Sequence, residues 1–197
     1  TVALVGYTNA GKSSLMRAMT GSEVLVADKL FATLDTTIRP IYPETRPKIL
    51  VSDTVGFIKK LPHDLVASFK STLDEALHAS LLLYVVDSSD LSFRSQLEVT
   101  QKVLKEVGVV DTPSVLILNK VDKLSESERA ALKLEFPEAI LISTLNKIDI
   151  ENLRLFLISR FEEGMVDEEL FVDYAQKGVV GEIRHQLRVL SENHTEN

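Results

Sequence analysis

The sequence predicts an α/β domain whose mostly parallel sheet is covered by helices on both faces. Short uninterrupted apolar runs, such as Leu81–Val86, alternate along the chain with longer segments in which apolar residues recur every three or four positions. Uninterrupted runs are typical of parallel strands buried on both faces, and the longer spacing is typical of helices. Their alternation indicates strands connected by helices that pack on the sheet.

The first half of the chain supplies four expected strands and two expected helices. The strands are placed at Thr1–Val5, Ile38–Tyr42, Lys48–Ser52 and Leu81–Val86, and the helices at Ser13–Met19 and Leu65–Leu77. Residues 21–36 show no clear periodicity and are expected to form a loop. Pro40 has no backbone N–H to donate, so the strand that contains it is expected at an edge of the sheet.

The second half continues the alternation as far as residue 164. Strands are expected at Ser114–Leu118 and Ala139–Ile142, and helices over residues 97–107, from Ser125 onward and over residues 153–161. Ser125 is followed by acidic residues, a favourable helix start because the hydroxyl accepts from the first turn and the acids face its positive end. We therefore predict one domain over residues 1–164.

Residues 165–197 predict a small C-terminal extension with a strand and a helix. Leu170–Tyr174 is strand-like, residues 179–190 carry an apolar stripe at helical spacing, and the chain from Ser191 onward is polar. The stripe consists of Val179, Val180, Ile183, Leu187 and Leu190. We expect it to pack on the domain; the alternative is a docking surface for a part of the protein outside this chain or for a partner.

Composition and charge exclude several classes of protein. The 197 residues are enough for one buried core and a small appendage, and 45% of them are apolar. The chain contains no cysteine, which excludes disulfides and thiolate chemistry, and no apolar run approaches the roughly 20 residues that span a bilayer. A net charge of −7 disfavours binding to nucleic acid through a general basic field. We expect a soluble, cytoplasmic protein without a leader segment that does not bind DNA.

The segment GYTNAGKSS is the first of four motifs that carry chemistry. It matches G-x-x-x-x-G-K-[ST] and stands between an expected strand and an expected helix. In that context the loop's backbone N–H groups and the start of the helix bind phosphate oxygens. Lys12 is expected to reach the β- and γ-phosphates, and the Ser13 hydroxyl to bind Mg²⁺. The predicted site residues are Gly6, Tyr7, Thr8, Asn9, Ala10, Gly11, Lys12, Ser13 and Ser14.

The second motif, Asp53-Thr54-Val55-Gly56, follows the strand expected at Lys48–Ser52. An acid at the end of a strand beside a phosphate loop can hold Mg²⁺, usually through water. A glycine three residues later leaves its N–H available for a γ-phosphate. We therefore expect Asp53, Thr54, Val55 and Gly56 at the nucleotide, with Asp53 at the metal.

The third motif, Asn119-Lys120-Val121-Asp122, directly follows the strand expected at Ser114–Leu118. The Asp122 carboxylate can accept hydrogen bonds from the N1–H and the 2-amino group of guanine. Adenine has no donors there, and a site that leaves its acceptor unpaired rejects such an analogue strongly. Asn119 is expected to brace the phosphate loop, and the Lys120 stem to lie over the base.

The fourth motif, Ser143-Thr144-Leu145, follows the strand expected at Ala139–Ile142. Its place suits a backbone N–H that reads guanine O6, and an ordinary turn between a strand and a helix is the alternative. All four motifs lie at the C-terminal ends of expected strands, where open α/β sheets bind ligands. This combination resembles the translation-factor-related P-loop GTPases over residues 1–163. The resemblance implies a three-layer fold on a six-stranded sheet whose second strand is antiparallel at one edge.

A closer resemblance is carried by LFATLD (residues 30–35), DTVGFIKKLPHDLVASFKSTL (residues 53–73) and GYTNAGKS. These segments are similar to the HflX family of ribosome-associated GTPases. That resemblance implies binding to the large ribosomal subunit and a role in rescue or splitting of stalled or idle ribosomes. It also implies a GTPase domain that lacks the family's N-terminal domain, and we expect it to be monomeric. Lys59 and Lys60 are candidate contacts to rRNA phosphate, the alternative being a solvated loop.

Three threonines compete for the position that binds Mg²⁺ and senses the γ-phosphate: Thr33, Thr36 and Thr37. Thr33 lies 20 residues after Ser13, a typical loop length for this class, and belongs to the family's motif. We predict Thr33, with Thr37 as the alternative, because Thr36 and Thr37 are placed to start the next strand. The predicted nucleotide contacts of this loop are Phe31, Ala32, Thr33, Leu34 and Asp35.

The source of catalysis is the open point of the sequence. Many relatives place a glutamine directly after D-x-x-G to orient the attacking water, and here that residue is Phe57. Slow intrinsic hydrolysis is therefore expected, with the missing group supplied by a partner, by a monovalent cation or by another side chain. Asn9 resembles the loop asparagine of potassium-activated GTPases, and the alternative is that it stabilises the turn. The predicted catalytic residues are Asn9, Lys12 and Thr33.

Overall fold

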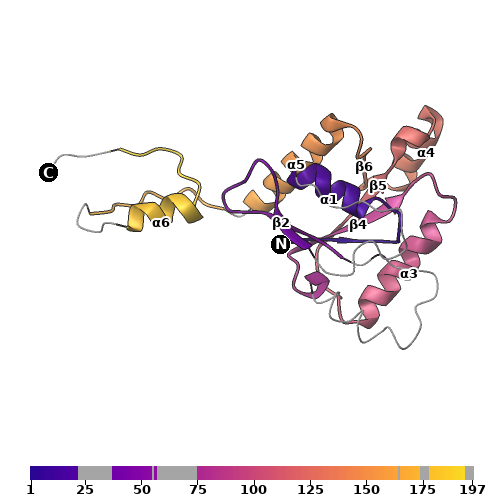
Figure 1. Cartoon of the computed structure of the whole chain (residues 1–197), viewed down its shortest axis with the longest axis horizontal. Coiled ribbons are helices and arrows are strands. Elements are labelled where there is room, and N and C mark those ends of the chain that lie inside the picture. The colour runs from indigo at the N-terminus through magenta and orange to yellow at the C-terminus, as the bar shows by residue number, and fades with distance from the viewer. Residues whose placement is uncertain (22–36, 55, 57–74, 164, 174–177, 194–197) are drawn as a thin grey trace.

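The computed structural model describes residues 1–21, 37–54, 56, 75–163, 165–173 and 178–193 (Figure 1). The strands are β1 (Val2–Val5), β2 (Thr37–Pro40), β3 (Leu50–Asp53), β4 (Leu81–Asp87), β5 (Ser114–Asn119) and β6 (Ile140–Leu141). The helices are α1 (Lys12–Thr20), α3 (Phe93–Glu106), α4 (Glu126–Glu135), α5 (Lys147–Glu162) and α6 (Val179–Gln186), with a 3₁₀ turn at Val121–Lys123.

Six strands form one sheet in the order β2-β3-β1-β4-β5-β6. Strand β2 pairs antiparallel with β3, and the other neighbouring strands pair in parallel. The predicted six-stranded sheet with one antiparallel edge is therefore confirmed. Pro40 ends β2 at this edge, where none of the described strands needs the backbone N–H that proline lacks.

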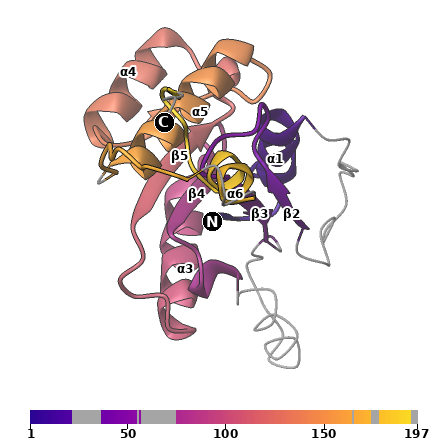
Figure 2. The ribbon, with the colours of Figure 1, turned by 90° about the vertical axis from the view of Figure 1, so that its left-hand side faces the viewer.

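The two faces of the sheet carry separate apolar clusters, and together they form the expected three layers. Alternate residues of β4 point to opposite faces: Leu83 and Val85 join a cluster with α1 and α5, and Leu82 packs with Leu104 of α3. On that second face, α3 and α4 meet around Phe93. Figures 1 and 2 show α1 and α5 on one side of the strands and α3 on the other. Burial of β4 on both faces explains its uninterrupted apolar sequence.

Helix boundaries follow local signals at each end. Helix α1 begins after Gly11 and ends at Gly21, and both glycines have positive φ angles, 97° and 63°. At α4 the predicted start is correct, because Ser125 and Glu128 cap each other's backbone N–H groups in a capping box. Helix α5 begins at Lys147, earlier than the apolar spacing indicated, because Asn146 accepts a hydrogen bond from Ile148 N.

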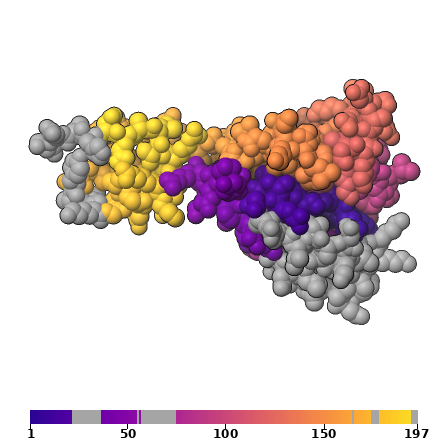
Figure 3. Space-filling model, turned by 45° about the horizontal axis from the view of Figure 1, so that its top comes forward, coloured from indigo at the N-terminus to yellow at the C-terminus, as the bar shows by residue number. Residues whose placement is uncertain are grey.

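The C-terminal extension differs from its prediction. Residues 170–173 form no strand, and Tyr174 lies outside the described residues. Helix α6 ends at Gln186 and has no buried residue, so the apolar stripe is not packed on the domain; Leu190, beyond the helix, is 62% exposed. Figure 3 shows this segment projecting from the body of the molecule. An isolated strand without a neighbour to pair with buries too little apolar surface to be stable.

Two arginines connect the extension to the domain. The Arg46 guanidinium donates to the carbonyl oxygen of Arg184, and Arg188 Nη1 lies 2.6 Å from Glu162 Oε1. Contacts between exposed charges of this kind add little stability. None of the helices in the described ranges combines the length and apolar character needed to span a bilayer. The boundary at residue 164 remains a prediction.

Candidate nucleotide-binding site

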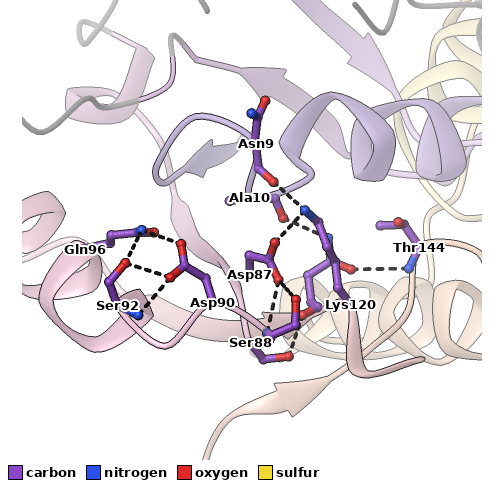
Figure 4. A network of polar contacts seen from close by, with 11 residues as sticks. Asn9, Ala10, Asp87, Ser88, Asp90, Ser92, Gln96, Lys120 and Thr144 are labelled. Carbon is purple, nitrogen blue, oxygen red and sulfur yellow. Dashed lines mark hydrogen bonds and ion pairs between the residues drawn. The ribbon is translucent and has the colours of Figure 1, made fainter. Parts of the chain in front are cut away.

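The four motifs converge at the carboxyl edge of the sheet. The phosphate loop follows β1, Asp53 ends β3, Asn119 ends β5, and Ser143 follows β6 shortly after its end. Parallel strands bring these chain ends to one side, which is where such sheets bind ligands. Figure 4 shows part of the resulting polar network.

Glycines give the phosphate loop its tight approach to the sheet. Gly6 has a φ of 151° and Gly11 a φ of 97°. A Cβ on Gly6 would clash with the backbone of Val85, and a Cβ on Gly11 would clash with the Asn119 side-chain amide. Gly11 is also the N-cap of α1, so no side chain covers the start of that helix. The loop and the helix N-terminus thus have the geometry expected of an anion-binding site, and phosphate binding there stays a prediction.

Lys12 is held inside the phosphate loop. Its Nζ donates to the carbonyl oxygens of Gly6 at 3.0 Å and Tyr7 at 2.9 Å, and its side chain is buried. Burial lowers the pKa of Lys12 to about 8, although the nearby charge of Asp53 acts in the opposite direction. A buried ammonium group with two carbonyl partners is positioned to bind phosphate oxygens.

The hydroxyl of Ser13 and the carboxylate of Asp53 lie side by side. Ser13 Oγ donates to Asp53 Oδ2 at 2.7 Å, and Asp53 is 1% exposed. Thr54 turns inward instead, since its Oγ1 donates to Leu4 O at 2.7 Å. In the described residues no group of three or more His, Cys, Asp or Glu gathers as a metal cage. One carboxylate and one hydroxyl fit Mg²⁺, which usually takes its remaining ligands from phosphate and water.

Gly56 lies directly against the phosphate loop. A Cβ at this position would come within 2.8 Å of Thr8 Cγ2 and 3.0 Å of Lys12 Nζ. Only glycine therefore fits here without displacing the loop, and its backbone is close to the Lys12 ammonium. The D-x-x-G motif and the phosphate loop meet in the structure as the sequence indicated.

Asn119 joins three loops of the site. It is completely buried, and its Nδ2 donates to Ala10 O of the phosphate loop at 2.9 Å. Its Oδ1 accepts from Thr144 N at 3.3 Å, and its backbone carbonyl accepts from Ser88. The structure thus forms the expected contact between Asn119 and the phosphate loop, and adds two further connections.

Lys120 adopts a left-handed backbone conformation with φ 64°, which is costly for a side chain of this type. Its Nζ donates to Asn9 O at 2.7 Å and to Asp87 Oδ2 at 2.6 Å (Figure 4). Val121 N donates to Ile142 O at 3.2 Å, so the turn is also tied to β6. Asp122 follows in the 3₁₀ turn with its side chain exposed.

Ser143, Thr144 and Leu145 form a turn whose N–H groups have partners inside the protein. Ser143 N donates to Asp149 Oδ2 at 2.8 Å, and Leu145 N donates to Ser143 Oγ at 3.3 Å. Thr144 N is engaged with Asn119. The segment lies beside the third motif, and its proposed contact with guanine O6 stays a prediction.

Several predicted site residues lie outside the described part of the chain. They are Phe31, Ala32, Thr33, Leu34, Asp35, Thr36, Val55, Phe57, Lys59 and Lys60. The alternative switch residue, Thr37, is described: it begins β2 and pairs in register with Asp53. The choice between Thr33 and Thr37 therefore stays a prediction.

Asp87 and Ser88 are polar residues of the site that the sequence interpretation missed. Asp87 ends β4 in register with Asn119, and Ser88 is buried directly after it. The sequence did contain a clue: Asp87 directly follows the apolar run of β4, just as Asp53 stands at the end of β3. Partial burial acts to raise the pKa of Asp87, but hydrogen bonds from Lys120 and Ser89 hold it below its ordinary value.

Comparison with known proteins gives consistent matches. A family model described as 50S ribosome-binding GTPase matches residues 1–120. A GTPase HflX from Gluconacetobacter diazotrophicus is 64% identical over 195 residues, covering 99% of this chain and 43% of the relative. A GTPase HflX from Caldanaerobacter subterraneus is 41% identical, covering 99% of this chain and 44% of the relative. The chain therefore spans less than half the length of these curated relatives.

Among solved structures, a GTP-binding protein from Sulfolobus solfataricus in complex with GDP is 32% identical, with a TM-score of 0.61. The match covers 80% of this chain and 51% of that protein. The family model covers well over half of the chain, and the relatives carry the name that the sequence motifs indicated. The chain belongs to the family of 50S ribosome-binding GTPases, and its resemblance to the HflX proteins is confirmed.

Proposed function

We propose that residues 1–164 form a GTP-binding and GTP-hydrolysing switch domain and that residues 165–197 form an extension with one helix. The observation that carries this proposal is the position of the Asn119–Asp122 segment. Hydrogen bonds from Asn119 and Lys120 to Ala10 and Asn9 hold the segment against the phosphate loop. A carboxylate that faces the base in such a site selects guanine, because adenine has no donors there and would leave it unpaired. The GDP complex of the Sulfolobus relative supports the same ligand class.

We propose that Mg²⁺ binds at Ser13 and Asp53, with Thr33 as a further ligand from the switch loop. The 2.7 Å contact between Ser13 Oγ and Asp53 Oδ2 supports this choice, because it places two oxygen ligands at one point. When bound, the ion neutralises charge on the β- and γ-phosphates. Lys12 adds a positive charge from inside the loop, and the Gly56 backbone lies beside it.

Hydrolysis is proposed to be slow without stimulation. Phe57 occupies the position where many relatives carry glutamine, and phenylalanine cannot orient water. The catalytic group is then supplied by a partner, by K⁺ held near Asn9, or by another switch side chain. The alternative is an interaction module that binds guanine nucleotide without hydrolysing it. Phe57 also favours this alternative, because it replaces the residue that would orient water.

We propose the large ribosomal subunit as the partner, with a role in rescue or splitting of stalled or idle ribosomes. The description of the matching family, 50S ribosome-binding GTPase, supports this partner. A cytoplasmic location follows from it.

Base selection is tested by competition for the bound nucleotide. We expect GDP to displace fluorescent GDP far better than ADP. Asp122→Asn should shift preference toward xanthosine diphosphate, whose 2-oxo group suits an amide donor. Preference for ADP, or unchanged preference in Asp122→Asn, would contradict the guanine assignment.

Turnover is tested by phosphate release with and without large ribosomal subunits, in Na⁺ and in K⁺. We expect slow release from the chain alone and stimulation by subunits, by K⁺ or by both. GTP binding without release under every condition would favour the interaction module over the enzyme. Stimulation by K⁺ alone would remove the support for the ribosome as the source of catalysis.

A further inference from the structure

The end of strand β4 contacts the predicted base-recognition segment through side chains that no motif marks. Asp87 pairs in register with Asn119, so the two strand ends lie next to each other. The Asp87 carboxylate accepts from Lys120 Nζ at 2.6 Å, and the two side chains are 18% and 24% exposed. In Figure 4 the two groups point toward each other beneath the phosphate loop. This is a partly buried ion pair, and removing one partner of such a pair costs more than removing a partner of an exposed one.

The same strand end also holds the backbone that precedes Lys120. Ser88 N donates to Asn119 O at 2.9 Å, and Ser88 Oγ donates to the same oxygen at 2.6 Å. Ser89 orients the Asp87 carboxylate, since Ser89 N and Oγ both donate to Asp87 Oδ1. The other Asp87 oxygen is thereby directed to Lys120.

Lys120 needs such support because of its backbone. Lys120 has a φ of 64°, and a left-handed conformation at a residue other than glycine is costly and persists only where surrounding contacts determine it. Asp122 lies two positions later, so a shift at Lys120 moves the carboxylate expected to read guanine. The ion pair therefore acts two positions before the residue that is expected to read the base.

We propose that Asp87 is a positioning residue for guanine recognition: it holds Lys120 against the phosphate loop and thereby fixes the turn that presents Asp122. This inference rests on the proposed GTP function. Asp87 is assigned no contact with the nucleotide, and its effect passes through Lys120. It determines how sharply the site distinguishes bases rather than whether phosphate binds.

The test measures GDP and inosine diphosphate, which lacks the 2-amino group of guanine, in wild type and in Asp87→Asn. The amide keeps the shape of the side chain but loses its charge. We expect GDP affinity to fall about tenfold, mainly through faster dissociation, because a charge-assisted hydrogen bond is weakened. The preference for GDP over inosine diphosphate should fall severalfold.

Asp90→Asn is the matched control. Asp90 lies in the same turn after β4, but its carboxylate accepts hydrogen bonds from Ser92 and Gln96. The charge of Lys120 acts on Asp90 only as the smallest of the influences that lower the pKa of Asp90, so base preference in Asp90→Asn should stay close to that of wild type. In a Lys120→Met background, Asp87→Asn should add less than about twofold, since coupled groups are not additive. Asp87→Glu, which keeps the charge, should recover part of the preference and serves if Asp87→Asn does not fold.

The outcomes separate this inference from the function beneath it. Failure of the wild-type chain to bind GDP would contradict the proposed function. Normal wild-type binding with unchanged base preference in Asp87→Asn, or equal effects in Asp87→Asn and Asp90→Asn, would overturn the role of Asp87. Full additivity with Lys120→Met would overturn the route through Lys120.

Discussion

The carboxyl edge of the sheet and the C-terminal extension are held in opposite ways. At the edge, buried Asn119 connects the phosphate loop, the end of β4 and the turn after β6 through short-range hydrogen bonds. In the extension, α6 has no buried residue, and exposed arginines take part in its contacts with the domain. The comparison shows where the chain places its buried hydrogen bonds: they hold together the loops of the candidate site, whereas the extension is held by exposed contacts.

Substituting one glycine in each region gives the largest expected contrast. Gly11→Ala places a Cβ against the Asn119 amide at a φ of 97°, whereas Gly181 in α6 has open space around it. We expect Gly11→Ala to weaken GDP binding by about 100-fold or more, because backbone strain and overpacking each cost on the order of 1–3 kcal/mol. Calorimetric titration with GDP and thermal unfolding measure both effects.

Gly181→Ala is the control, and its effect should have the opposite sign. Alanine in a helix interior is favoured over glycine by about 0.5–1 kcal/mol, and the change is expected to stay local to α6. GDP affinity should not change. Equal losses of GDP binding in the two variants would mean that the extension and the site are one rigid unit.

Asn9 is an exposed residue of the phosphate loop, and its substitution gives the next largest effect. Two roles would account for an asparagine at this position. Asparagine tolerates the φ of 62° better than most residues, which is enough for a turn-stabilising role. A K⁺ ion would instead need the side-chain oxygen. Asn9→Gly keeps the conformation and removes the oxygen. If K⁺ binds there, K⁺ stimulation of turnover should fall about tenfold or more, the size of effect seen when one oriented charge is lost.

Asn9→Asp provides the comparison, since it keeps an oxygen at the same place. GDP affinity should be near wild type in Asn9→Gly, because Lys120 bonds to the Asn9 backbone carbonyl and not to its side chain. Undiminished K⁺ stimulation in Asn9→Gly would leave only the turn-stabilising role for this residue.

The sequence predicted the residues whose roles are set by their place at a strand end. Asp53 and Asn119 both close apolar runs inside recognisable spacings, and the structure brings both to the phosphate loop. Asp87 closes an apolar run too, but it belongs to no recognisable motif that would assign it a partner such as Lys120. A spacing pattern contains no information on such a pairing, which depends on the register of β4 against β5.

The extension could not be predicted from its apolar residues for a related reason. Apolar spacing at Leu170–Tyr174 and over residues 179–190 indicates elements that could bury a face, but not whether a neighbour exists to cover it. In the domain the neighbours are present, so strands such as β4 form where expected. In the extension residues 170–173 remain without a strand.

The pH dependence of GDP binding tests whether buried Lys12 binds phosphate in its charged form. Burial lowers the pKa of Lys12 to about 8, and bound phosphate favours its charged form. Below pH 8 the ammonium is already charged, so affinity should be flat. Above pH 8 binding must take up a proton, and affinity should fall by up to about tenfold per pH unit.

The measurement is the Kd for GDP between pH 7 and pH 9 in EDTA, which removes metal from the comparison. Lys12→Arg is the control, because arginine stays charged throughout this range. Its affinity should be lower but independent of pH. A flat profile for the wild-type chain would mean that Lys12 does not bind phosphate as its charged form.

The smallest effect is expected at the contact between the extension and α5. Arg188 and Glu162 are 60% and 34% exposed, so Arg188→Ala should change the free energy of unfolding by about 0–1 kcal/mol and GDP affinity by less than about twofold. The main expected effect of Arg188→Ala is on the position of α6 rather than on the free energy of unfolding. Since the chain has no cysteine, spin labels at Lys147→Cys and Glu182→Cys can report the distance between α5 and α6. We expect a broader distance distribution in Arg188→Ala than in the chain with Arg188. If the distribution is unchanged and the free energy of unfolding falls by more than about 2 kcal/mol, the extension unfolds together with the domain.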